Sequence, residues 1–146
     1  MKLFLDTSSL FKLYHQEIDS NLIEGIFAAH TVRTIFLSDL TKVEFASTVW
    51  KKLRTRDITE LQATTLLESF KYDFDKYTFI QIDNIIIEQA QDLLKKHGSK
   101  GLRALDSIQL STAVMLKSQV DLFISADNLL NFFLEHESLQ TRQPGS

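Results

Sequence analysis

The chain has 146 residues, 44% hydrophobic and 24% charged, which is the composition of one ordinary globular domain. It contains no cysteine, so disulfide bonds and thiolate metal sites are excluded. The formal net charge of −3 gives no overall attraction to nucleic acid and argues against a passive DNA- or RNA-binding protein. No apolar run reaches the length of a membrane-spanning helix, so we expect no membrane partner.

Segments typical of strands and of helices alternate along the chain. Short apolar runs predict strands at 2–5, 34–37, 77–82 and 122–124, with a candidate fifth strand at 138–141. Helices are expected at 8–14, 20–30, after Ser38, after Thr59, and at 84–96, 103–118 and 128–135. This alternation predicts an α/β fold with a parallel sheet covered by helices on both faces. We expect one domain over residues 1–141 and a disordered tail at 142–146.

Two acidic residues follow predicted strands. Asp6 comes directly after the run Leu3-Phe4-Leu5, and Asp127 follows the strand at 122–124. In open α/β sheets, ligands and catalytic groups collect at the carboxyl ends of the strands. Each aspartate could instead simply cap the helix that follows it, a common role for this residue.

Two further acids lie on predicted helices. Glu44 is at the edge of an apolar stripe, where an isolated glutamate is usually just solvated. Asp106 shares a helix face with Leu110 and Ala113. A carboxylate on a packed face costs several kcal/mol unless it is paired or bound to a cation. Arg103, three residues earlier, is a candidate ion-pair partner.

Four carboxylates that converge on one cleft would need cations. Hard divalent ions prefer oxygen ligands, and Mg²⁺ usually binds a few carboxylates together with water and substrate phosphate. One ion lowers the pKa of a bound water, and a second can stabilise the leaving oxygen in phosphoryl displacement. The four histidines show no ligand spacing. The pattern therefore favours a metal-dependent enzyme.

The motifs that carry these acids resemble those of a PIN domain. They are LFLDTSSL with Asp6, LSDLTKVEFAS with Glu44, GLRALDSIQLSTAV with Asp106 and LFISADNLL with Asp127. Their order and spacing fit the family over nearly the whole chain, and the small single-domain form is similar to VapC-type toxins of toxin–antitoxin pairs. The resemblance implies a PIN-like three-layer sandwich with a central parallel sheet of four to five strands.

The resemblance also implies an activity. It implies an endoribonuclease toxin that hydrolyses RNA phosphodiester bonds through a metal-activated water, with Mg²⁺ or Mn²⁺ bound by Asp6, Glu44, Asp106 and Asp127. Ser125 matches the small hydroxyl residue that would orient the last of these acids or the water. The implied partners are a cognate antitoxin, a second copy of the chain in a homodimer, and an RNA such as tRNA or another structured RNA. The implied location is the cytoplasm.

Basic residues near two of the acids are candidates for RNA binding. They are Lys51, Lys52, Arg54 and Arg56 after Glu44, and Lys100 and Arg103 before Asp106. Such residues could hold phosphates beside the cleft. Alternatively, basic residues near helix C-termini only offset the helix macrodipole.

Two other functions remain open. A phosphatase of the haloacid-dehalogenase kind also begins with a strand and an aspartate, but it needs a second aspartate two positions later, where this chain has Ser8. A non-catalytic PIN-fold binding module would be expected to lose some of the four acids, and all four are present.

Overall fold

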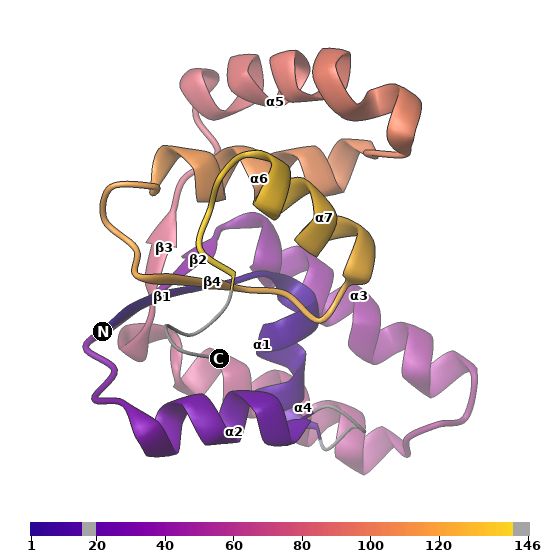
Figure 1. Ribbon diagram of the computed structural model, residues 1–146. Coiled ribbons are helices and arrows are strands. Elements are labelled where there is room, and N and C mark those ends of the chain that lie inside the picture. The colour runs from indigo at the N-terminus through magenta and orange to yellow at the C-terminus, as the bar shows by residue number, and fades with distance from the viewer. Residues whose placement is uncertain (16–19, 142–146) are drawn as a thin grey trace.

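The computed structural model describes residues 1–15 and 20–141 and confirms the expected α/β architecture (Figure 1). The strands are β1 (Lys2–Leu5), β2 (Thr34–Ser38), β3 (Thr78–Ile80) and β4 (Leu122–Ile124). The helices are α1 (Thr7–Tyr14), α2 (Ser20–Ala29), α3 (Leu40–Arg54), α4 (Glu60–Tyr72), α5 (Asn84–His97), α6 (Ala104–Met115) and α7 (Asn128–His136), with single 3-10 turns η1 (Phe74–Lys76) and η2 (Gly98–Lys100). The expected tail at 142–146 lies outside the described residues. No helix in the described part is long and apolar enough to cross a membrane.

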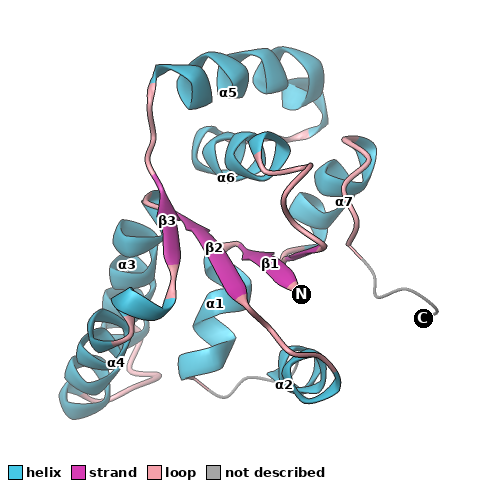
Figure 2. Cartoon of the chain, turned by 90° about the vertical axis from the view of Figure 1, so that its left-hand side faces the viewer, coloured by secondary structure: helices cyan, strands magenta, loops and turns pink. Residues whose placement is uncertain are grey.

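The sheet has the order β3-β2-β1-β4, and every pairing is parallel. Side chains alternate between its two faces, as the pleat of a strand requires. Phe4 and Phe123 pack on one face against α6 and α7, whereas Leu5 and Leu37 pack on the other against α1, α3 and α4. Figure 2 shows these helices on opposite sides of the strands. This arrangement is the predicted three-layer sandwich.

The strand order creates a crevice at one edge of the sheet. The chain runs outward from β1 through β2 to β3 and then returns to place β4 on the other side of β1. The connections therefore leave β1 and β4 in opposite directions, which is the switch point where open α/β sheets bind ligands. Leu5 pairs with Ile124, so the two strands end level with each other. The residues that follow them, Asp6 and Ser125, are brought together at this edge.

Residues 138–141 do not form the candidate fifth strand. In this segment Gln140 O accepts a hydrogen bond from Phe123 N at 2.8 Å, while Leu139 N donates back to Leu134 O at the end of α7. One bond to β4 does not make a ladder, because a strand needs regularly repeated pairing. The sheet accordingly has four strands in the described part of the chain.

A cluster of charged side chains around the buried ring of His97 ties the end of α7 to α5. Glu137 Oε2 accepts from Lys96 Nζ at 2.7 Å and lies 2.8 Å from Nε2 of His97, which is buried. Burial alone would raise the pKa of Glu137, but the hydrogen bonds and charges of Lys96 and His97 outweigh it and lower that pKa below its usual value. A carboxylate with a lowered pKa stabilises the fold only while it is ionised.

Glu137→Gln is therefore expected to lower the free energy of unfolding at neutral pH by about 1–2 kcal/mol. The native pKa lies below the unfolded one, so the difference from wild type should be full above about pH 5 and should fade as pH drops through the native value. Urea unfolding between pH 7 and pH 3 measures this. Glu135→Gln, at an exposed position on α7, is the matched control and should change stability by less than about 0.5 kcal/mol. A deficit that stays constant with pH would contradict this account.

Candidate active site

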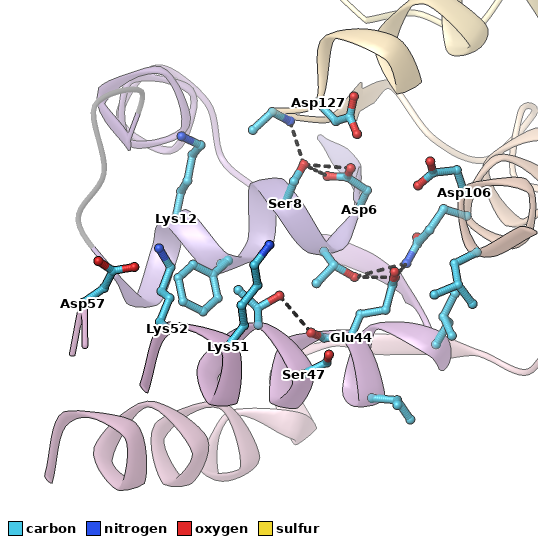
Figure 3. A pocket seen from close by; sticks show the side chains of 18 of the residues that line it. Asp6, Ser8, Lys12, Glu44, Ser47, Lys51, Lys52, Asp57, Asp106 and Asp127 are labelled. Atoms are coloured by element: carbon cyan, nitrogen blue, oxygen red, sulfur yellow. Dashed lines mark hydrogen bonds between the residues drawn. The ribbon is translucent and has the colours of Figure 1, made fainter. Parts of the chain in front are cut away.

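A cavity of about 820 Å³ opens at the carboxyl edge of the sheet. Its lining comes from α1, α3, α6 and the segment after β4. All four acids singled out in the sequence, Asp6, Glu44, Asp106 and Asp127, line it (Figure 3). Residues as far apart in sequence as 6 and 127 therefore face one space.

Asp6 is held in place by the serines around it. It is buried at the N-cap of α1, and its Oδ1 accepts from Ser9 N at 3.0 Å and from Ser9 Oγ at 2.8 Å. Its Oδ2 accepts from Ser125 Oγ at 2.6 Å and from Ser8 Oγ at 2.8 Å. Burial raises the pKa of Asp6, although the hydrogen bonds from the three serines act in the opposite direction. Ser125 does not line the cavity but positions an acid that does.

Glu44 is fixed by a polar network that crosses the sheet edge. Its Oε1 accepts from Thr7 Oγ1 at 2.9 Å and from Gln109 Nε2 at 2.8 Å. The same Gln109 Nε2 lies 3.0 Å from Thr41 Oγ1, and Thr7 and Thr41 are 3.1 Å apart. This orientation of the amide is the favourable one, since the flipped amide would turn its carbonyl towards the carboxylate. Three elements, α1, α3 and α6, thus fix one carboxylate.

Gln109 lines the cavity and is one of the residues that the sequence did not single out. It is 2% exposed, and its Oε1 is buried without a hydrogen-bond partner among the described residues. The available signal was spacing, because a residue three positions after Asp106 shares its helix face and a glutamine there is polar among apolar neighbours. Its hydrogen-bond partner Glu44 is 65 residues away in sequence, so no local sequence pattern predicts this contact.

Among the four acids, the negative charge of Asp106 is the least compensated by hydrogen bonds or positive charges of the described residues. It is half-buried in the first turn of α6, and its side chain makes no hydrogen bond with another described residue. Burial raises its pKa, and the negative charges of the other three acids raise it further. The charge of Arg103 lowers that pKa only in part, and no ion pair joins the two residues within the described ranges.

Asp127 has two roles at once. It is the N-cap of α7, where its Oδ1 accepts from Leu129 N at 2.8 Å and from Leu130 N at 3.2 Å. Both capping bonds use the same oxygen, so Oδ2 remains available to the cavity. For Asp127, as for Asp6, helix capping and a place in the cavity are compatible.

The donor set suits a hard divalent cation. Every candidate ligand is a carboxylate oxygen, the donor that Mg²⁺ and Mn²⁺ prefer. In their present positions no three histidine or acidic side chains of the described residues are grouped closely enough to hold an ion. Asp6, Glu44 and Asp127 are each hydrogen-bonded to neighbouring residues in these positions, so binding one cation requires side-chain movement. The raised pKa of Asp106 indicates a deficit of positive charge that a cation would relieve.

The structure separates the candidate RNA-binding residues into two groups. Lys51 and Lys52 line the cavity together with Lys12, which the sequence did not single out. Arg54, Arg56, Lys100 and Arg103 do not line it. Within α3 the difference follows from helix geometry, since only some residues of a basic run share the face that carries Glu44. Arg56, Lys100 and Arg103 lie outside this helix.

The surroundings of Ser8 disfavour phosphatase chemistry of the haloacid-dehalogenase kind. That chemistry needs a second carboxylate two positions after the first, as a proton donor or acceptor for the reacting oxygens. Here the hydroxyl of Ser8 donates to Asp6 and accepts from Ala126 N at 3.0 Å. Ser8 acts as a bridge between the two strand ends.

Comparison with known proteins finds the same fold in several solved structures. Solved structures with the same fold include VapC20 from Mycobacterium tuberculosis, described as a sarcin–ricin loop cleaving toxin, with 15% identity and a TM-score of 0.66 over 90% of this chain and 94% of that chain. FitAcB from Neisseria gonorrhoeae gives 14% identity and a TM-score of 0.72 over 97% of both chains. A toxin–antitoxin complex from Klebsiella pneumoniae gives 17% identity and a TM-score of 0.60 over 86% of both. At such low identity these likenesses show the fold alone.

Comparison by sequence is more specific. No curated protein matches the chain. The family model of the PIN domain matches residues 3–131. That range contains all four acids of the cavity and most of the chain. The chain therefore belongs to the PIN domain family.

Proposed function

We propose that this protein is a divalent-metal-dependent endoribonuclease that hydrolyses RNA phosphodiester bonds. The observation that carries the proposal is the cavity at the switch point, where four separate elements each contribute one carboxylate. Four acids in one space are costly to the fold unless a cation compensates them, and helix capping by Asp6 and Asp127 does not account for Glu44 and Asp106. RNA as the substrate is supported by membership of the PIN family and by the likeness to a toxin that cleaves the sarcin–ricin loop.

In this proposal Asp6, Glu44, Asp106 and Asp127 hold Mg²⁺ or Mn²⁺. The cation would supply a lowered pKa for the attacking water and positive charge for the leaving oxygen. The protein's own contribution is positioning: Ser125 and Ser9 orient Asp6, and Gln109 orients Glu44. Fixed side chains reduce the reorganisation needed as charge develops in the transition state.

The proposal includes a biological role as the toxin of a toxin–antitoxin pair. It is supported by the toxin and toxin–antitoxin structures that share the fold. A cognate antitoxin, a homodimer and a cytoplasmic location follow from this role. Exposed apolar side chains next to the cavity, Val43 and Leu105, offer contact area for a protein partner.

Metal removal tests the catalytic part. Purified protein is incubated with total cellular RNA in Mg²⁺, in Mn²⁺ and in chelator, and the products are separated on a denaturing gel. We expect discrete products with either metal and none in chelator, because the attacking water needs its pKa lowered. Restoring Mn²⁺ after chelation should restore cleavage.

Calorimetric titration with Mn²⁺ separates the ways in which this proposal can fail. Metal binding without cleavage of any RNA would leave a cation site but reject the ribonuclease. Neither binding nor cleavage would reject both and favour the non-catalytic PIN-fold binding module.

A further inference from the structure

The cavity that holds the four acids has a second end of opposite charge. Lys12 of α1 and Lys51 and Lys52 of α3 line it as well. Figure 3 shows the three lysines to one side of the four acids, with Lys51 between Glu44 and Lys52, and Asp57 on the side of the lysines. The four acids and the three lysines thus face one continuous space from different ends.

The separation is set by α3. Glu44, Thr48, Lys51 and Thr55 succeed one another at helical spacing, and all four line the cavity. Glu44 and Lys51 are seven residues apart, which is about 10 Å along the helix axis. At that distance the lysine cannot pair with the acid, and Lys51 makes no salt bridge with any described residue.

An RNA strand needs such a basic end. The protein carries a net charge of −3, and the four carboxylates repel a polyanion. A bound cation offsets the acids locally but does not hold the rest of the strand, because each further phosphate needs its own counter-charge. The cavity volume of about 820 Å³ is in the range of pockets that enclose a whole small ligand, so it has room for more than the reacting phosphate.

We propose that the lysine end of the cavity is a phosphate subsite, in which Lys51, assisted by Lys52 and Lys12, binds a neighbouring phosphate of the same RNA strand. This inference rests on the proposed ribonuclease function, since it places that second phosphate relative to the one attacked at the acids. The hydroxyls of Thr48 and Thr55 already donate within the protein, to Glu44 O at 3.0 Å and to Asp57 Oδ2 at 2.7 Å, so the lysines supply the donors to the phosphate. The subsite fixes the position of the strand without reading its sequence.

The chain offers a matched control for the simpler explanation. Basic residues in the last turn of α3 also offset its macrodipole, and Arg54 shares this role with Lys51. Arg54 does not line the cavity. Replacing either residue by glutamine removes one positive charge from the same helix end, so only the subsite distinguishes them.

Replacing Asp57 is expected to change RNA affinity in the direction opposite to replacing Lys51. It lines the same end of the cavity and accepts a hydrogen bond from Thr55 Oγ1 at 2.7 Å. Its negative charge opposes phosphate binding there. Asp57→Asn should therefore tighten RNA binding, whereas Lys51→Gln should weaken it.

Binding is measured in chelator on the non-cleaving Asp106→Asn background, with a fluorescent single-stranded RNA oligonucleotide at several salt concentrations. We expect Lys51→Gln to weaken binding roughly threefold to tenfold and to reduce the slope of log K against log salt by about 0.7. Arg54→Gln should change the affinity and the salt slope much less. Lys51→Arg should bind RNA with nearly the affinity of the parent protein. In the cleaving protein, Lys51→Gln should raise KM with kcat nearly unchanged.

Equal losses in Lys51→Gln and Arg54→Gln would overturn the subsite, because the effect would then be general electrostatics. The absence of measurable binding by the parent at low salt would overturn it as well. The ribonuclease proposal fails separately: it is lost if the protein with all four acids does not cleave RNA, even where the lysine variants differ in binding.

Discussion

Asp106→Asn is expected to reduce metal-dependent RNA cleavage roughly a thousandfold or more. The substitution keeps size and one oxygen ligand but removes a negative charge from the proposed cation site, and a cation's contribution to such a transition state is worth several kcal/mol. The fold should be intact, because the Asp106 side chain makes no hydrogen bond with the rest of the described structure. Initial rates at matched Mn²⁺ concentrations give the measurement.

Asp92→Asn is the control for the loss of one negative charge. Asp92 is exposed on α5 and does not line the cavity, so its variant should cleave at the wild-type rate. Cleavage by Asp106→Asn at a comparable rate would remove Asp106 from the site. Stability gives a second readout: in chelator the variant should melt at a higher temperature than wild type, because crowded carboxylates repel. Saturating Mn²⁺ should narrow this gap by stabilising mainly the wild type.

The fold was predictable because its signals are local. Apolar runs such as Leu3-Phe4-Leu5 and helix starts such as Thr59 follow from residues adjacent in sequence. Thr59 forms a capping box with Gln62, which donates its N–H to the threonine hydroxyl at 3.2 Å and accepts from Thr59 N at 2.9 Å. The placement of Asp6 and Asp127 was predictable for the same reason, since Asp6 directly follows β1 and Asp127 lies three residues after the end of β4.

Element ends were predicted less well because tertiary contacts set them. The strand expected at 77–82 pairs only over Thr78–Ile80, and its last residue lies opposite Ser38, where β2 also ends. Beyond this pair a single backbone bond follows, from Asp39 N to Ile80 O at 2.9 Å. Among side chains, Gln109 and Lys12 share the limitation. Gln109 contacts Glu44, and Lys12 lines the cavity, only because helices distant in sequence pack together. Neither contact has a recognisable sequence pattern.

Gln109→Met is expected to weaken Mn²⁺ binding by roughly 10- to 100-fold, as is typical when the partner that orients a metal ligand is lost. Gln109 Nε2 donates to Glu44 at 2.8 Å, and methionine fills a similar volume without a donor. Glu44 would keep its bond from Thr7 but would lose the contact that holds it against α6. Calorimetric titration with Mn²⁺ measures the change without depending on RNA cleavage.

Stability separates this positioning role from a merely structural one. Loss of the Nε2 donor should lower the free energy of unfolding by about 1–3 kcal/mol. Gln109 Oε1 is buried without a described partner, so removing this oxygen should raise the free energy of unfolding by a similar amount. The melting temperature should thus change little while metal affinity falls. Gln89→Met is the control, because Gln89 on α5 accepts from Ser111 Oγ of α6 at 3.1 Å, outside the cavity. It should leave Mn²⁺ affinity unchanged. If Gln109→Met lost stability and kept its affinity, the network would serve packing between α1, α3 and α6, and Glu44 would be oriented by Thr7 alone.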